Sequence, residues 1–558
     1  MMTRSVAVKE FAVLAIILGP FANRPACQEA PIQSQVHDAP KAYAKSPIMG
    51  VSLKGASENE ILEMAQALKE TGLKDKGYNY IVLSDWQSSR RSVDNRLCFD
   101  NGLFSDGIAL LKKLKGEHGI KVGLNTSISD LTSGGKPGSM HFEALDARTF
   151  AEWGVDYVRV DYSHVTDVAK DKNGIGDGAW PTATPNLNYV GYNKLNGATA
   201  FETRIPWTYF TLSGGASISG NRLTGLSANG GAATFTINVA ADDVGKYMIA
   251  FGYNKQRNGD ASRERIIQAI VSNKASGIYN ETYNFVFPRS SMWNNESRAT
   301  CVIDLREGTN TITLRNPVTG RESDAAVRYS AMAAFFQKHC PSVLFAINDW
   351  GKAGSLAWVN GEDSFAYSAR VAADPTDMAS VKVTYDSAIA SQNPSVITDL
   401  GSINSLLAEE DIKAQLSIWS VLASPIILDA NSEKLGEHAN LFGNEYMLDI
   451  LNDSPRIRCK LVLVLNGVDV VARPLSGNRV ALLIYNKGAA ASAVPININI
   501  DDILGKDSRI ELSKARYYEV KDVWSGRTEK VAKAFPVPQI PANGAALYIL
   551  KASTTRGH

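Results

Sequence analysis

Strand and helix patterns alternate along two separate stretches of the chain, and this alternation constrains the fold more than any other feature. In the first stretch, the candidate strands are SPIMGVSL, YNYIVLSD, IKVGLNTS and YVRVD, with helix patterns between them. In the second, they are SVLFAINDW, SFAYSARVAAD, SVITDLGS and PIILDAN. Strands that alternate with helices at this spacing are typical of parallel βαβ units. Eight such strands predict an α/β fold, a (β/α)8 barrel. Asp146 is expected to cap the helix DARTFAEWG.

Carboxylates stand where several of these strands end. Asp85, Asp161, Asp349 and Asp429 are at strand ends, and Asp374 follows another strand closely. An aspartate is a poor strand former, so its presence there needs a reason. Active sites of (β/α)8 barrels lie at the C-terminal ends of the strands. We therefore predict that these carboxylates are catalytic or bind a ligand. A simple strand-end cap remains the alternative for Asp161.

Two further stretches contain strand patterns without helix alternation. Residues 163–325 include AATFTINVA, KYMIAFGY, ATCVIDL and NTITLRN, separated by turn residues. This stretch far exceeds the roughly 12–15 residues that a structureless loop tolerates, and it predicts an inserted β-sandwich. Residues 456–558 contain RVALLIYN, AALYILKA and similar segments, which predict a C-terminal antiparallel β-sandwich domain. The barrel is then expected to consist of residues 46–162 (strands 1–4) and residues 326–455 (strands 5–8).

The N-terminus has the pattern of an export signal. Arg4 and Lys9 precede the apolar run FAVLAIILGPFA, which is too short to span a bilayer and is typical of a secretory signal. A buried N-terminal helix is the alternative. We predict a signal peptide over residues 1–27, a polar linker over residues 28–45, and a secreted or periplasmic protein. Cys27 could carry a lipid anchor.

Composition and charge narrow the classes of partner. The formal net charge is +1, and charged residues make up 21% of the chain, so nothing indicates a nucleic-acid partner. The rest of the chain has no long apolar run, and we expect no membrane span. The five cysteines form no CxxC pair or His/Cys cluster that would indicate a metal site. The oligomeric state is left open.

One long segment resembles a known family. KVGLNTSISDLTSGGKPGSMHFEALDARTFAEWGVDYVRVDYS is similar to the third and fourth strand region of glycoside hydrolase family 27, which contains the alpha-galactosidases. The match includes Pro137-Gly138-Ser139, Glu143, Asp146-Ala147 and Trp153 to Tyr157. IKAQLSIWSVLASPIILDAN and VARPLSGNRVALLIYNKG resemble later parts of that family. The insert resembles a family 35 carbohydrate-binding module. The resemblance implies a retaining hydrolase of terminal alpha-galactosidic bonds in oligo- or polysaccharides, acting through an aspartyl glycosyl-enzyme.

The resemblance also implies roles for individual residues. Asp161 matches the nucleophile, and Asp374 matches the acid/base because it stands four residues after Arg370. Glycoside hydrolysis needs two such carboxylates and no metal or organic cofactor. A neighbouring arginine would keep the nucleophile ionised. The residues expected to bind substrate are Asp85, Trp86, Arg159, Asp349, Trp350 and Arg370.

Several of these assignments have alternatives. Asp377 could replace Asp374 as the acid/base, since sequence cannot show the geometry that this role requires. Arg370 could be a structural ion-pair partner. Trp86 and Trp350 could pack in the core rather than face a sugar.

The chain departs from the family pattern at the sugar pocket. Ser84 stands in place of the first aspartate of the family's DDCW, and Val51 stands in place of a tryptophan. Ser133 and Ser163 occupy the places of two cysteines that form a disulfide in the family. These changes weaken the expectation of galactose. An isomalto-dextranase-like or beta-L-arabinopyranosidase-like glycosidase is therefore an alternative, and a non-catalytic carbohydrate-binding protein is an alternative from another class.

Overall fold

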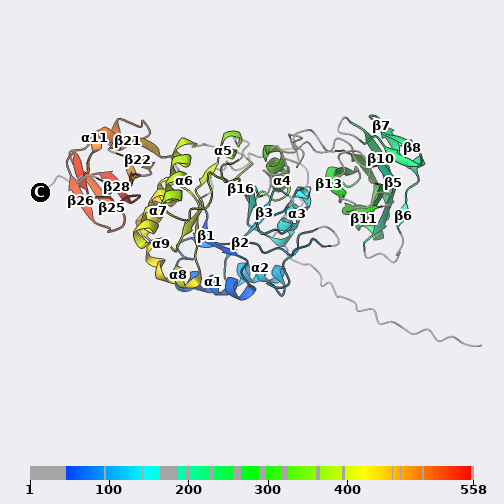
Figure 1. Cartoon of the computed structure of the whole chain (residues 1–558), viewed down its shortest axis with the longest axis horizontal. Helices are drawn as coiled ribbons and strands as arrows, with labels where there is room; N and C mark the ends of the chain where they lie inside the picture. Colours follow the sequence, from blue (N-terminus) through cyan, green and yellow to red (C-terminus); the bar gives the residue numbers. More distant parts are fainter. Residues whose placement is uncertain are drawn as a thin grey trace, which may run out of the picture.

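The computed structural model describes residues 46–553, except for 93–95, 130, 141, 164–185, 196–201, 227–229, 255–264, 288–296, 317–324, 353, 360–364, 392–395, 455–456, 466 and 493–495. Three bodies lie along the longest axis of the molecule (Figure 1). A strand–helix body is in the middle, an antiparallel β-domain is on the right, and a second β-domain is on the left. The predicted signal peptide and linker, with Cys27, lie outside the described residues. Among the described residues, no helix combines the length and apolar character needed to cross a membrane.

The central body is built on a parallel sheet of nine strands in the order β18-β17-β16-β4-β3-β2-β1-β20-β19. The two outermost strands of this sheet are separated in the chain only by Leu400 and Gly401, so the sheet closes on itself there. The strand predicted from SVITDLGS is therefore split into two halves that close a (β/α)8 barrel, and the predicted fold class is confirmed. The strands are β1 (Met49–Lys54), β2 (Tyr78–Ser84), β3 (Lys121–Ser127), β4 (Tyr157–Asp161), β16 (Leu344–Asn348), β17 (Ser368–Arg370), β18 (Ile397–Asp399), β19 (Ser402–Asn404) and β20 (Ile426–Asp429).

Amphipathic helices cover the outside of the barrel. The first helix buries Ile61, Met64, Ala65 and Leu68 at helical spacing, and Ser57 closes a capping box at its start. The helices are α1 (Glu58–Glu70), α2 (Gly107–Gly116), α3 (Glu143–Trp153), α4 (Ala325–His339), α5 (Ser355–Trp358), α6 (Met378–Ala390), α7 (Glu409–Val421), α8 (Ser432–Glu437), α9 (Ala439–Phe442) and α10 (Glu445–Asn452).

The prediction that Asp146 caps its helix is wrong. Helix α3 already begins at Glu143, and no side chain caps its first turn. Asp146 is fully buried inside that turn and receives two hydrogen bonds from Arg91, at 2.7 and 2.6 Å. The ion pair fixes the loop after β2 to the start of α3.

The strands that follow β4 form two antiparallel sheets with their own apolar core. Their orders are β13-β12-β15-β10-β7 and β14-β11-β5-β9-β8, and β6 pairs with β5. Phe235, Ile237 and Val239 alternate with more exposed residues along one of these strands, as expected of a sandwich. The strands are β5 (Asn186–Lys194), β6 (Thr203–Arg204), β7 (Thr211–Ser213), β8 (Ser217–Ser219), β9 (Arg222–Thr224), β10 (Ala232–Val239), β11 (Gly245–Asn254), β12 (Arg265–Asn273), β13 (Ile278–Phe287), β14 (Ser297–Leu305) and β15 (Gly308–Arg315).

Arg148 ties this inserted domain to the barrel. It projects from α3 and forms ion pairs with Glu281 of β13 and Asp304 of β14. Its guanidinium also lies 5.3 Å from the ring centroid of Tyr283. All three partners belong to the insert, so the tie runs from one barrel helix to two strands of the insert.

The C-terminal domain is antiparallel and packs on helix α7 of the barrel. Trp524 donates a hydrogen bond to the Ser417 hydroxyl of that helix at 2.9 Å, and the sheet order is β21-β22-β23-β28-β25-β26, beside the pair β24-β27. The elements are β21 (Lys460–Leu465), β22 (Val468–Leu475), β23 (Arg479–Asn486), β24 (Ile496–Asn499), α11 (Ile500–Leu504), β25 (Tyr518–Asp522), β26 (Thr528–Val531), β27 (Ala534–Val537) and β28 (Ala545–Ala552).

Candidate active site

Asp161 ends β4 in a buried position. It pairs in register with Asn348, the last residue of β16, and the Asn348 Nδ2 donates a hydrogen bond to its Oδ1 at 2.6 Å. Only 8% of Asp161 is exposed. Burial raises the pKa of Asp161 to about 6, against the opposing effects of Arg159, the Asn348 hydrogen bond and Arg370. Asp161 is thus a buried carboxylate that is costly to ionise.

Asp374 occupies the opposite electrostatic environment. Its Oδ1 accepts a hydrogen bond from Arg370 Nη1 at 2.6 Å and another from the Ser402 backbone N–H at 2.9 Å. Desolvation by burial acts to raise its pKa, but Arg370, Arg159 and the hydrogen bonds outweigh it and hold the pKa of Asp374 well below its usual range. Asp374 is therefore ionised in the unliganded site.

The break in the split strand makes room for this carboxylate. Gly401 has φ +100°, and a Cβ on it would lie 3.2 Å from both Asp374 Oδ1 and Arg370 Nη1. Glycine is favoured here both for its backbone conformation and for the space that it leaves. The Ser402 N–H that follows it then reaches Asp374. The same break that closes the barrel thus builds one wall of the site.

Two buried arginines act electrostatically on both carboxylates. Arg370 is 1% exposed and lies between Asp374 and Asp399, whose Oδ1 is 3.0 Å from its Nε. Arg159 is 6% exposed and lowers the pKa of both Asp161 and Asp374. The structure thus brings four of the predicted site residues together. The proposed structural role of Arg370 is also observed, because it pairs with two carboxylates.

Asp85 lies at the same end of the barrel, directly after β2. Its Oδ2 is 3.7 Å from Lys54 Nζ, and a Cβ on Gly134 would come within 2.3 Å of its Oδ1. The neighbouring Ser84 Oγ accepts a hydrogen bond from Asn125 Nδ2 at 2.6 Å. Where the family pattern has an aspartate, this chain therefore has a neutral hydrogen-bonded pair.

Trp86 requires a correction. It is 1% exposed, and its ring packs against those of Phe99, Phe150 and Trp153 at centroid distances of 4.9, 6.1 and 5.8 Å. Its Nε1 donates to the Asn125 carbonyl at 2.8 Å. No face of Trp86 is open to a sugar, so the prediction that it binds substrate is wrong and the packing alternative holds.

Asp349 also departs from its predicted role. It is fully buried, and its two carboxylate oxygens accept hydrogen bonds from the backbone N–H groups of Gly351 at 3.1 Å and Ser355 at 3.0 Å. Asp349 therefore organises the loop after β16 instead of facing a ligand. Trp350, which follows it, is partly exposed and has φ +52°, with Lys352 Nζ 5.2 Å from its ring centroid. Trp350 remains a candidate for sugar contact.

The alternative acid/base, Asp377, has a different function in the structure. It is exposed and caps α6, where its Oδ1 accepts from the Ser380 N–H at 2.8 Å. Asp429, at the end of β20, lies near enough for Asp374 to raise its pKa, although burial contributes more. The candidate pair is therefore Asp161 and Asp374.

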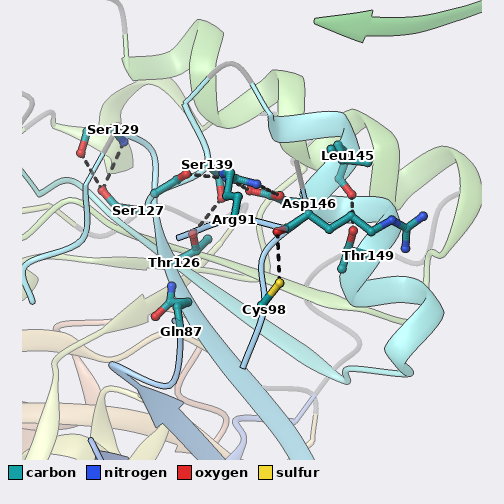
Figure 2. Close-up of polar contacts among 12 residues, drawn as sticks. Gln87, Arg91, Cys98, Thr126, Ser127, Ser129, Ser139, Leu145, Asp146 and Thr149 are labelled. Atoms are coloured by element: carbon teal, nitrogen blue, oxygen red, sulfur yellow. Dashed lines mark hydrogen bonds and ion pairs between the residues drawn. The ribbon is translucent and has the colours of Figure 1, made fainter. Parts of the chain in front are cut away.

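Hydroxyl groups at the end of β3 make contacts next to the site, and Figure 2 shows those among Thr126, Ser127, Ser129 and Ser139. Ser127 Oγ lies 3.0 Å from Ser129 Oγ and donates to the Asp161 carbonyl at 3.3 Å. Thr126 Oγ1 lies 2.8 Å from Ser139 Oγ, which joins the end of β3 to the Pro137-Gly138-Ser139 segment. Figure 2 also shows Arg91 beside Asp146, from where it donates to the Gly138 carbonyl at 2.6 Å.

Sequence reasoning missed Asn348, Asn125 and the Ser402 N–H. A signal for Asn348 existed, because it is a polar residue at the end of the apolar strand LFAIN, as Asp161 is at the end of YVRVD. The contribution of Ser402 is a backbone group positioned by a strand break, and it leaves no such signal. Within the described ranges, no group of three or more His, Cys, Asp or Glu side chains is arranged to hold a metal ion.

Two segments of the chain match models of known protein families. Residues 52–191 match the family model described as alpha galactosidase A, and residues 466–550 match the alpha galactosidase C-terminal beta sandwich domain. The chain is alpha-galactosidase-like in these segments. The first one contains Asp85, Arg159 and Asp161, whereas Arg370 and Asp374 lie between the two.

Curated relatives are similar over part of their length. Alpha-galactosidase mel1 of Schizosaccharomyces pombe is 33% identical over 172 residues, which are 30% of this chain and 36% of the relative. Alpha-galactosidase A of Homo sapiens is 37% identical over 106 residues, 19% of this chain and 25% of the relative. The chain thus spans about a third or less of the length of these relatives.

Solved structures are similar over nearly the whole chain. Alpha-galactosidase I of Mortierella vinacea superposes with a TM-score of 0.58 at 18% identity, covering 93% of this chain and 100% of that one. A family 27 beta-L-arabinopyranosidase of Geobacillus stearothermophilus gives a TM-score of 0.54 at 10% identity, covering 92% and 98%. These likenesses establish a shared fold.

Proposed function

We propose that the protein is a glycoside hydrolase of the alpha-galactosidase type, acting on terminal alpha-galactosidic bonds of oligo- or polysaccharides. The observation that carries the proposal is the pair of Asp161 and Asp374 at the C-terminal end of the barrel, both of which are influenced electrostatically by Arg159 and Arg370. Two carboxylates at this place fit glycoside hydrolysis. The partial matches to alpha-galactosidases support the same activity.

A retaining mechanism would use the pair in two steps. Asp161 attacks the anomeric carbon while Asp374 gives its proton to the leaving oxygen, which forms an aspartyl glycosyl-enzyme. Asp374 then takes a proton from water, whose oxygen attacks the anomeric carbon and releases Asp161. The pair therefore enters the reaction with one proton. In the unliganded site this proton resides on Asp161, because its pKa is the higher one, so substrate binding must shift it to Asp374.

Product stereochemistry tests this mechanism. NMR of the first product released from an aryl alpha-galactoside should show the alpha anomer. Asp161→Ala should abolish turnover and leave the fold intact. Initial release of the beta anomer would remove Asp161 from the nucleophile role. A screen of aryl glycosides and oligosaccharides that finds no hydrolysis would instead favour a non-catalytic carbohydrate-binding protein.

The Ser84–Asn125 pair favours a second candidate with a different sugar. A neutral hydroxyl replaces a carboxylate, which loses a charge-assisted hydrogen bond to the sugar worth roughly 1.5–3 kcal/mol. An alpha-1,6-glucan or a beta-L-arabinopyranoside would then compete with galactose. Ser84→Asp should improve kcat/KM on aryl alpha-galactoside relative to the glucan. This role of Ser84 would be contradicted if the natural enzyme already has a kcat/KM of about 10⁴–10⁸ M⁻¹s⁻¹ on the galactoside and does not hydrolyse the glucan.

Two further expectations rest on sequence alone. We propose that the inserted domain binds carbohydrate, because its sequence resembles a family 35 carbohydrate-binding module. We also propose export to the periplasm or the medium, because residues 1–27 have the pattern of a signal peptide. The first proposal can be tested with the Asp161→Ala variant, which should bind a polysaccharide without hydrolysing it. Its binding should weaken when Tyr209, an exposed residue of the insert, is also replaced by Ala. Fractionation of producing cells would test the second.

A further inference from the structure

We propose that Asn348 is a positioning residue that stabilises the ionised form of Asp161 and orients it for attack. The two residues end neighbouring parallel strands and face each other in register. Asn348 is 2% exposed, and its Nδ2 lies 2.6 Å from Asp161 Oδ1. In the described part of the chain, this is the only hydrogen bond that the Asp161 carboxylate accepts. A buried carboxylate with a single donor depends strongly on that donor.

A buried amide at position 348 costs stability, and this cost supports a role for Asn348 beyond packing. Every residue of β16 is buried, and an apolar side chain would fill the last position without needing a partner. The Asn348 Oδ1 is buried and has no hydrogen-bond partner among the described residues. A buried unpaired acceptor is destabilising. The hydrogen bond to Asp161 is therefore the compensation that the structure offers for this amide.

The orientation of the amide depends on the charge of Asp161. An ionised carboxylate can only accept hydrogen bonds, so it requires the NH₂ side of Asn348. The other charged or titratable groups that face Asp161 are Arg159 on its own strand, Arg370 and Asp374 from β17 and its loop, and Tyr329 on α4. The Tyr329 hydroxyl donates instead to the Val160 carbonyl at 3.2 Å. Without Asn348, the charge on Asp161 would be held by the two arginines through longer-range attraction alone.

A pH-resolved stability measurement tests this role without any substrate. Asn348→Leu removes the donor at nearly unchanged volume. Relative to the natural protein, it should be equally or more stable at about pH 4, where Asp161 is protonated, and less stable at about pH 8. The Asp161 pKa should rise by roughly one to two units, as expected for a lost hydrogen bond to a charged group. Combined with Asp161→Asn, the same substitution should have an effect that does not change with pH.

The matched control is Asn404→Ala. Asn404 also ends a barrel strand, in register with Asp429, but the hydrogen bonds of its side chain go to the Thr376 carbonyl and the Leu406 N–H and not to a carboxylate, so its effect should be constant with pH. If Asn348→Leu also shows a constant effect, Asn348 only packs and the proposal fails. Should Asn348→Leu not fold, Asn348→Ala removes the same donor with a smaller side chain, and an Asp161 pKa that stays unchanged in that variant would overturn the proposal.

A kinetic arm rests on the proposed function. In Asn348→Leu, the limb of the kcat/KM profile near pH 6 should move to higher pH by the same roughly one to two pH units. In this variant, kcat should also fall by a larger factor than KM changes. A limb that stays in place would contradict the positioning role. If the natural protein hydrolyses no aryl glycoside, the proposed function fails, whereas the stability measurement still decides the role of Asn348.

Discussion

Replacing Asp161 by Asn should inactivate the protein and also make it more stable. The fold holds the pKa of Asp161 at about 6 instead of 3.8, because burial disfavours the charged form. The difference of about 2 pKa units corresponds to roughly 3 kcal/mol of unfolding free energy. The sign follows from linkage, since the folded state binds the proton more tightly than the unfolded chain. Stability is therefore lost as pH rises from about 4 to about 6, and it stays lost above about 7.

Asparagine is neutral at every pH and avoids this loss. We expect Asp161→Asn to match the natural protein at about pH 4 and to exceed it by roughly 3 kcal/mol above about pH 7. For a barrel of about 250 residues, this raises the melting temperature of the barrel transition by about 6 °C. Differential scanning calorimetry at both pH values measures it. A variant that is less stable at the higher pH, or a difference independent of pH, would refute the argument that Asp161 carries a buried ionisation cost.

Three other predictions concern the same end of the barrel and its connection to the insert. The kcat/KM should fall about tenfold per pH unit above about pH 6, because the carboxylate pair then loses its last proton, and a flat profile would contradict this. Gly401→Ala should cost about 1–2 kcal/mol of stability and reduce turnover, whereas Gly436→Ala, with open space around it, should do neither. Arg148→Ala should lower the melting temperature of the insert in calorimetry and speed its proteolysis. The control is Lys194→Ala, because the ion pair of Lys194 with Asp243 lies within the insert. This variant should not speed proteolysis at the connection between the insert and the barrel.

Apolar patterning made most of the barrel predictable. Strands such as β2 and β4 are short apolar runs, and helix α1 shows buried residues at helical spacing, so periodicity alone indicates them. The carboxylates at strand ends were predictable for the opposite reason, since they break the apolar pattern. Asp161 and Asp374 share a site in the structure, as that reasoning expected of the ends of parallel strands.

What sequence could not supply was the direction of individual side chains. Trp86 and Trp350 both follow a strand, yet the first is enclosed by three aromatic rings and the second is partly exposed. Asp349 differs from Asp161 by its position beyond the strand end, where loop N–H groups take both of its oxygens. The strand split at Gly401 pairs with β17 on one side of the break and with β20 on the other. Pairing with strands so far apart in the chain has no local signature in a single sequence.

Several costs that the fold carries lie at the C-terminal end of the barrel strands. Asp161 is buried with a charge that it resists, Asn348 leaves an acceptor unpaired, and Trp350 has a left-handed backbone that is unfavourable for a bulky residue. Strain of this kind persists only where the surrounding structure over-determines it. Because stabilising each of these positions would remove a group from the site, their shared location is itself an argument that this end of the barrel performs chemistry.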